Sequence, residues 1–259
     1  MEDRLRSVSI GFSQRIQLDW LELTAQLVLA GYNREALRKE LQYRLKDKLS
    51  VGDDLDVPKK ADGSSRAKAI RVLLRTWETV PPGLGPFRDD GLRLIQGLPT
   101  ADHLAIHWGM ILAVFPFFAA VAEATGRLDR LQGSVTAKQV QRRVSEQFGE
   151  RETIARAARR ILSCYFDWGI LCPTSEKGVY KAVLPRPVND NTSAAWLVEA
   201  TLIGSSSQSG TLGALSQSPS LFPFALARPI AITTPRLEVF RQGLDEDVVT
   251  RRELAVGLR

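Results

Sequence analysis

Side chains that could bind a polyanion are concentrated in one part of this 259-residue sequence. Residues 134–186 contain ten lysine or arginine residues against five acidic ones, whereas residues 1–133 contain 19 against 17 and residues 187–259 contain six against seven. This stretch therefore carries most of the net charge of +6. Clustered positive charge attracts nucleic acid because each neutralised phosphate releases a condensed counterion. A basic, solvated surface without a partner is the alternative interpretation.

The spacing of these charges indicates two consecutive helices with different tasks. In the second helix, four arginines lie off the apolar stripe, mostly in the N-terminal half that a recognition helix presents to base edges. Arginine suits this position because its planar fork pairs with guanine or with a phosphate. Basic residues of the preceding helix and of a following hairpin would then meet the DNA backbone. We expect DNA contacts from Thr136, Lys138, Gln139, Arg142, Arg143, Arg151, Thr153, Arg156, Arg159, Arg160, Lys177 and Lys181.

Local signals predict the two helices that would hold these residues. Thr136 and Gln139 match the S/T-x-x-E/Q capping box at the start of a helix. Apolar residues then recur every four positions until Gly149, which can end the helix because glycine tolerates a positive φ. The second helix begins only a few residues later, and two helices joined this tightly predict a helix-turn-helix.

A hairpin is expected directly after the second helix. The short apolar run Ile170–Cys172 and the β-prone run Val179–Val183 flank a turn with a charged tip at residues 173–178. Ser134 and Val135 could supply a third strand before the first helix. The complete order predicts a winged helix-turn-helix between about Ser134 and Arg186.

Residues that commonly perform catalysis are not arranged to do so in this sequence. His103 and His107 are the only histidines, and their spacing of four residues lacks the glutamate of an H-E-x-x-H zinc motif. We expect them to make ordinary hydrogen bonds. Cys164 and Cys172 have no second pair with which to form a zinc site, so reduced thiols are expected. The sequence predicts a non-enzymatic protein with no cofactor and no metal.

The rest of the chain is expected to flank this module on both sides. The predicted regions are an N-terminal helical region over residues 1–100, the winged-helix region with a long first helix over residues 101–186, and an extension of short helices and strands over residues 187–259. Residues 50–66 have few large apolar side chains and predict an exposed loop. In the extension, Leu221–Phe224 should dock on the chain or on a partner. Short strands are expected at Ile230–Thr233 and Leu237–Val239.

The stretch Leu104–Ala122 is apolar enough to be considered as a membrane span. It contains His107, Gly109 and a central Pro116, and similar basic content lies on both sides, so a buried central helix of a soluble protein is the favoured interpretation. No apolar leader is apparent at the N-terminus. We therefore expect a cytoplasmic location and no membrane partner.

Three segments resemble the BrxA family of BREX phage-defence systems. They are LDWLELTAQLVLAGYNREALRKEL, LAIHWGMILAVFPFFAAVAEATGRL and ARRILSCYFDWGIL, so the resemblance covers residues 15–171 as a pattern of elements. It implies a small, helical, non-enzymatic DNA-binding protein that works with other subunits of a defence complex. The hairpin and the extension after Pro185 are outside the resemblance.

Taken together, the sequence predicts a mainly α protein with an N-terminal helical region and a central winged helix-turn-helix that carries a small β-hairpin wing. Its expected function is to bind double-stranded DNA. The alternative is an adaptor subunit of a multiprotein assembly, because winged helices also dock proteins. That adaptor would use the winged helix and Leu221–Phe224 as protein contacts.

Overall fold

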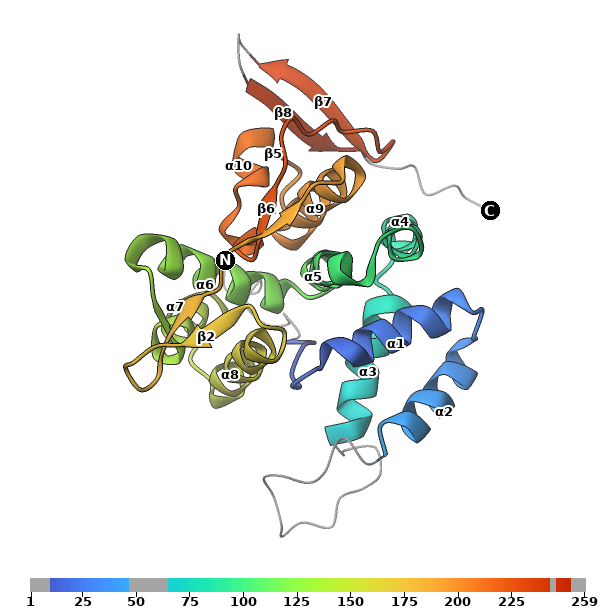
Figure 1. Ribbon diagram of the computed structural model, residues 1–259, viewed down its shortest axis with the longest axis vertical. Helices are drawn as coiled ribbons and strands as arrows, with labels where there is room; N and C mark the ends of the chain where they lie inside the picture. The colour runs from blue at the N-terminus through green and yellow to red at the C-terminus, as the bar shows by residue number, and fades with distance from the viewer. Residues whose placement is uncertain (1–9, 47–64, 243–245, 253–259) are drawn as a thin grey trace.

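The computed structural model describes residues 10–46, 65–242 and 246–252, so most of the loop expected at 50–66 lies outside the described residues. The described chain is mainly α, as the sequence predicts, with three small sheets (Figure 1). The helices are α1 (Leu18–Leu29), α2 (Arg34–Arg44), α3 (Ser65–Trp77), α4 (Gly85–Gly97), α5 (His103–Val114), α6 (Pro116–Gln132), α7 (Ala137–Phe148), α8 (Glu152–Asp167), α9 (Asn191–Gly204) and α10 (Leu212–Ser216), with short 3-10 turns η3 (Thr100–Asp102) and η4 (Pro219–Leu221). The strands are β1 (Val135–Thr136), β2 (Leu171–Pro173), β3 (Val179–Ala182), β4 (Arg186–Val188), β5 (Ser209–Thr211), β6 (Phe224–Leu226), β7 (Leu237–Gln242) and β8 (Glu246–Arg251).

Helix α5 lies at the centre of the molecule, and all of its residues are buried. Helices α1, α3, α4, α6 and α9 pack against it. In Figure 1, helices α1 to α4 lie to one side of α5 and α6 to α8 lie to the other, while α9, α10 and the C-terminal strands lie above. The buried apolar side chains of all three groups form one continuous core around α5.

The apolar stretch Leu104–Ala122 was expected to form one buried helix, and this expectation is wrong. The chain bends by 118° between the helical segment that ends at Val114 and helix α6. Pro116 causes the break, because its ring excludes the helical conformation for the preceding Phe115 and provides no N–H to continue α5. Phe115 accordingly adopts an extended conformation, with φ −125° and ψ 92°, and Pro116 begins the next helix.

The break at Pro116 divides the apolar stretch that was considered as a membrane span. Among the residues that the structure describes, no single helix is long and apolar enough to cross a membrane. The bent pair of segments 100–114 and 116–132 reaches the required length and composition only when its two halves are taken together. The first of these segments contains α5, which is enclosed by other helices of the same chain.

Two glycines let the C-terminal extension approach the central helices closely. A Cβ atom at Gly109 of α5 would collide with the ring of Trp196 on α9. A Cβ atom at Gly126 of α6 would collide with the carbonyl group of Pro219 in η4. The residues after Pro185 are therefore part of the same packed structure as α5 and α6.

The segment Leu221–Phe224 is docked inside the molecule. Leu221 and Phe224 are buried, and the indole of Trp108 donates a hydrogen bond of 2.9 Å to the carbonyl of Ser220. The apolar anchor therefore packs on α5, where Phe222 and Phe224 lie against the ring of Trp108. Strand β6 of this region pairs in parallel with β4. The strand expected at Ile230–Thr233 is not formed, whereas the one expected from Leu237 is present as β7.

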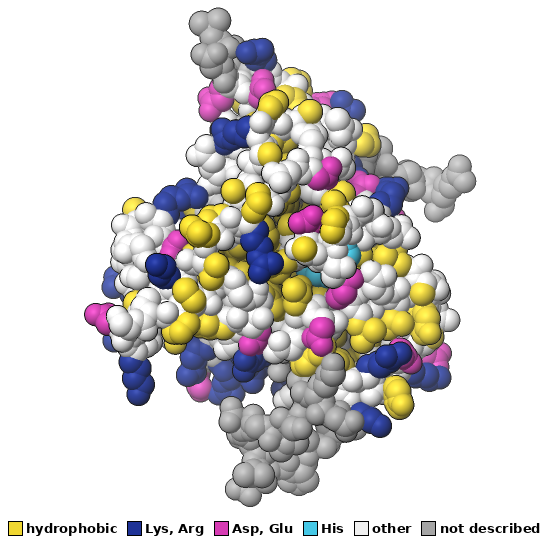
Figure 2. All heavy atoms as spheres, viewed as in Figure 1, with side chains coloured by type: hydrophobic (Ala, Val, Ile, Leu, Met, Phe, Trp, Pro, Cys, Tyr) yellow, Lys and Arg dark blue, Asp and Glu magenta, His cyan; other side chains and the backbone are white. Residues whose placement is uncertain are grey.

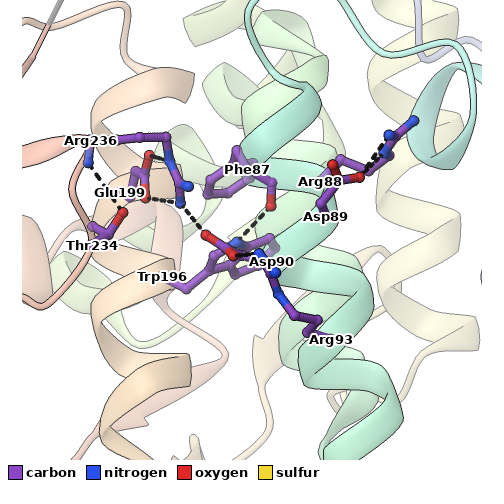
Figure 3. A network of polar contacts seen from close by, with 9 residues as sticks. All are labelled: Phe87, Arg88, Asp89, Asp90, Arg93, Trp196, Glu199, Thr234 and Arg236. Carbon is purple, nitrogen blue, oxygen red and sulfur yellow. Dashed lines mark hydrogen bonds and ion pairs between the residues drawn. The ribbon is translucent and has the colours of Figure 1, made fainter. Parts of the chain in front are cut away.

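A polar network joins the start of β7 to the helices (Figure 3). The Arg236 guanidinium donates to both carboxylate oxygens of Glu199 on α9, at 2.6 and 2.9 Å, and lies 2.6 Å from a carboxylate oxygen of Asp90 on α4. Beside it the rings of Phe87 and Trp196 stack with centroids 4.3 Å apart. These contacts fasten three segments that are distant in the sequence.

Candidate nucleic-acid interface

Residues 134–186 form two helices and a small antiparallel sheet. The strand order is β1-β3-β2, with Val135 opposite Tyr180 and Leu171 opposite Ala182. Helices α7 and α8 follow β1, and the hairpin β2–β3 follows α8. The amide of Ala182 donates a 3.1 Å hydrogen bond to the carboxylate of Asp129, which holds the sheet against the end of α6.

Helix α7 begins at the expected capping box. The Thr136 hydroxyl accepts a hydrogen bond from the Gln139 amide at 3.2 Å, and the Gln139 side-chain oxygen accepts one from the Thr136 amide at 3.0 Å. Each side chain thus satisfies an amide that the first turn of the helix would otherwise leave unpaired. The cap occupies both side chains that were expected to contact DNA at this end of α7.

Packing between α7 and α8 decides which faces of the two helices remain exposed. Val140, Val144 and Phe148 are buried on α7, and Ile154, Ala158 and Ile161 are buried on α8. The Gln141 side chain donates a 3.2 Å hydrogen bond to the carbonyl of Ala155 across the pair. The tight connection contains Gly149 with φ +90°, a conformation that glycine adopts without a steric penalty.

The N-terminal half of α8 presents a basic face to solvent. Thr153, Arg156 and Arg159 are all exposed along one side of the helix. Arg156 forms a 2.7 Å ion pair with Glu152 one turn earlier, and both side chains are more than half exposed. In Figure 2, Lys and Arg side chains gather along the lower left of the molecule, where Figure 1 places α8 and the hairpin.

The C-terminal half of α8 has a different environment. A guanidinium nitrogen of Arg160 donates a 2.6 Å hydrogen bond to the carbonyl of Ser13, and Arg15 forms a bidentate pair with Asp167 at 2.5 and 2.6 Å. The indole of Trp168 donates to the carbonyl of Ile16 at 2.9 Å. The chain segment that precedes α1 therefore covers this half of α8, and Arg160 holds that segment in place.

The other expected contact residues are on α7, at the start of α8 and in the hairpin. Lys138, Arg142 and Arg143 are exposed on α7, and Arg142 lies 3.5 Å from Glu146. Arg151, at the N-cap of α8, donates a 3.2 Å hydrogen bond to the carbonyl of Phe148. In the hairpin, Lys177 lies at the turn and Lys181 on β3, and both are exposed.

The histidine pair has a partner that the sequence analysis missed. One carboxylate oxygen of Glu22, on α1, lies 2.9 Å from His103 Nδ1 and 2.9 Å from His107 Nε2. Hydrogen bonding to His107 is the main cause that lowers the pKa of Glu22 to about 2, while burial lowers the pKa of His107. The signal in the sequence was a glutamate that directly follows the apolar residues Trp20 and Leu21.

Neither the histidines nor the cysteines form a metal centre in the described part of the chain. No group of three or more histidine, cysteine, aspartate or glutamate side chains there could hold a metal ion. Cys164 is buried, which raises the pKa of its thiol to about 12, and Cys172 is half-buried. Both thiols are free.

Comparison with models of protein families found no match. Comparison with curated proteins found none either. Among solved structures, no similar chain was found. The function of the module is therefore inferred from its own residues.

Proposed function

We propose that residues 134–186 form a winged helix-turn-helix that binds duplex DNA, with α8 as the recognition helix and the β2–β3 hairpin as the wing. The observation that carries this proposal is the exposed N-terminal half of α8, where Arg156 and Arg159 share one face. A recognition helix uses this half to reach base edges in the major groove. The segment that precedes α1 covers the C-terminal half of α8. The N-terminal half of α8 remains exposed and accessible to DNA.

The basic residues around α8 support the same proposal. Lys138, Arg142 and Arg143 on α7, with Lys177 and Lys181 on the hairpin, would contact phosphates on either side of the recognition helix. Some of the residues expected to contact DNA are already engaged in contacts within the protein. Thr136 and Gln139 are engaged in the helix cap, and Arg160 is engaged by Ser13. The proposed interface therefore centres on Arg156 and Arg159.

A fluorescence-anisotropy titration with a labelled mixed-sequence duplex, at about 50 and about 200 mM salt, tests the proposal. We expect affinity that falls steeply with salt. Replacing Arg156 or Arg159 by alanine should weaken binding by about 1–3 kcal/mol, which is roughly 5- to 150-fold. The charge reversal Arg156→Glu should weaken it further.

Arg44→Glu is the matched control for Arg156→Glu. Arg44 on α2 forms the same type of ion pair, 2.7 Å from Glu40 one turn earlier, and its side chain is 57% exposed against 53% for Arg156. Both variants change the net charge equally, so a general charge effect would weaken both. Equal DNA affinity for Arg156→Glu and wild type would exclude α8 as the recognition helix.

Exposed apolar side chains keep the adaptor function as a second candidate. Leu131 at the end of α6 is 80% exposed, and Val183 and Leu184 after β3 are 41% and 87% exposed. An adaptor that used them would show no salt-dependent DNA binding in the same titration. The proposed biological setting, an accessory of a BREX phage-defence system, rests on the resemblance of residues 15–171. It predicts that deleting the gene lowers the phage resistance of a host that carries the system.

A further inference from the structure

A pocket of about 470 Å³ lies between α6 and the C-terminal extension. One wall is a single face of α6, where Pro116, Ala120 and Glu123 are spaced by three or four residues. Residues of α9, α10 and η4 form the opposite wall, and Phe148 at the end of α7 also lines the pocket. Its volume is within the range of pockets that enclose small organic ligands.

Two close contacts hold the walls of this pocket in position. Gly204 of α9 packs so tightly that a Cβ atom there would lie 2.8 Å from the carbonyl oxygen of Leu112 on α5. Pro219 of η4 is in similarly close contact with Gly126 of α6. Leu112, Gly204 and Pro219 themselves line the pocket. Tightly packed walls resist deformation, so the pocket is formed before any ligand enters it.

Apolar side chains cover much of the interior. Leu112, Ala119, Ala200 and Leu215 all line the pocket, and each is at most 8% exposed. Transfer of an apolar ligand from water to such a surface is favourable by about 25 cal/mol for each Å² that is buried. The pocket is therefore suited to a ligand with an aromatic or aliphatic body.

Hydroxyl groups on the α9 side of the pocket offer hydrogen-bond acceptors. The Thr201 hydroxyl donates its proton to the carbonyl of Leu197 at 3.0 Å. The Ser205 hydroxyl donates to the carbonyl of Leu202 at 3.2 Å. A hydroxyl oxygen keeps its lone pairs when its proton is engaged in this way. Thr201 and Ser205 can therefore accept a hydrogen bond from an N–H or O–H group of a ligand.

Among the described residues that line the pocket, Glu123 and Arg151 are charged. The carboxylate of Glu123 forms an ion pair with Arg127, one turn later on α6. Arg151, at the N-cap of α8, instead donates to a neutral group, the carbonyl of Phe148. A guanidinium group has five N–H donors, so this bond leaves donors of Arg151 for a ligand. The planar fork of arginine favours an anionic group with two oxygens.

We propose that this pocket binds a small organic anion with an apolar body. Arg151 holds the anionic group, the body lies between α6 and α9, and Thr201 and Ser205 accept a hydrogen bond from it. The site does not depend on DNA binding by α8, so each of the two proposals can fail without the other.

The fluorescent dye anilinonaphthalene sulfonate tests this proposal, because it combines an aromatic body, an N–H group and a sulfonate. Its matched control is phenylnaphthylamine, which has the same body and the N–H group but lacks the sulfonate. Both dyes are titrated into the full-length protein and followed by their fluorescence. We expect saturable binding of one molecule of the sulfonate, roughly tenfold tighter than binding of the neutral amine.

Two variants test the walls of the pocket, each with its own control. Arg151→Gln removes the positive charge but keeps an N–H donor for the Phe148 carbonyl, and Arg142→Gln removes an equal charge from the exposed face of α7. Ala120→Leu fills the pocket from the α6 side. Ala124→Leu adds the same side chain one turn later, at a half-buried residue that is not among the described lining residues. Circular dichroism establishes that each variant is folded under the conditions of the titration.

Arg151→Gln should weaken binding of the sulfonate roughly tenfold and leave binding of the amine unchanged. Ala120→Leu should weaken binding of both dyes, while the two control variants should bind like wild type. If Arg151→Gln weakens both dyes equally or weakens neither, Arg151 does not hold the anionic group and the proposal is overturned. It is also overturned if Ala120→Leu binds the sulfonate like wild type, or if wild type shows no saturable binding.

Discussion

At the scale of single residues, Glu22 shows how burial and hydrogen bonding set the charge state of a cluster. Its carboxylate accepts from His107 Nε2, so this nitrogen carries the ring proton, while His107 Nδ1 is buried without a hydrogen-bond partner in the described structure. Burial opposes the charged imidazolium of His107, and the hydrogen bonds favour the charged carboxylate of Glu22. His107 is therefore a neutral hydrogen-bond donor, and Glu22 is its anionic acceptor.

This arrangement makes stability depend on pH with a definite sign. The pKa of Glu22 falls from 4.5 to about 2 on folding, so its stabilising contribution is complete above pH 4.5 and is lost as the pH falls toward 2. The lowered pKa of His107 acts in the same direction, because the unfolded state takes up the proton first below pH 6.5. Both shifts therefore lower the free energy of unfolding as the pH falls.

We expect Glu22→Gln to lower the free energy of unfolding at neutral pH by up to about 3 kcal/mol, the equivalent of the pKa shift. The difference between wild type and variant should shrink as the pH falls from 5 toward 3, since Glu22 of the unfolded wild type then takes up a proton while Glu22 of the folded protein stays charged. Urea denaturation at several pH values measures it. A difference that stays constant across this range would show that the charge of Glu22 is not what stabilises the cluster.

At the scale of an element, the structure of the N-terminus of α7 distinguishes between two possible roles of Thr136. The sequence alone is compatible with a DNA contact and with a helix cap, whereas the hydrogen bonds place the hydroxyl in the cap. Helix α7 depends on this cap because it supports β1 on one side and packs against α8 on the other.

Thr136→Ala should therefore lower the free energy of unfolding by about 1 kcal/mol, the usual cost of an N-cap, and leave DNA affinity almost unchanged. Thr136→Ser retains the hydroxyl and should be close to wild type in both respects. Denaturant unfolding and anisotropy measure the two quantities on the same proteins. The opposite pattern, a loss of affinity with full stability, would return Thr136 to the proposed DNA interface.

At the scale of the whole molecule, the contacts of Arg236 integrate the C-terminal extension with the helices. Glu199 is only 3% exposed, and Arg236 supplies both of its charged hydrogen bonds. The salt bridge to Asp90 extends the connection to α4 (Figure 3). Removal of one member leaves a buried charge without compensation, which costs more than the pair itself contributes.

Arg236→Ala should lower the free energy of unfolding by about 3–5 kcal/mol. Adding Glu199→Gln to this variant should recover part of the loss, because the uncompensated charge is then gone. Thermal unfolding followed by circular dichroism measures both. Arg252→Ala is the control, since Arg252, directly after β8, forms an exposed pair with Glu238 of β7 and its loss should cost less than about 1 kcal/mol. Equal losses for the two single variants would exclude a special role for the buried network.

The sequence by itself determined the features that depend on neighbours along the chain. The capping box at Thr136, the turn at Gly149 and the four-residue apolar period of α7 each involve residues within one or two helical turns, so their physics is readable from spacing. The mainly α class follows from the same signals. The break at Pro116 was not predicted, and its 118° angle depends on what packs against the second helix.

Only the tertiary structure decided which residues far apart in sequence meet. Arg159 and Arg160 are adjacent, yet one is exposed and the other binds Ser13, because successive residues of a helix point about 100° apart and the N-terminal segment covers only one direction. The partnership of Glu22 with the two histidines arises in the same way. No local period encodes it, since it depends on how α1 and α5 are brought together.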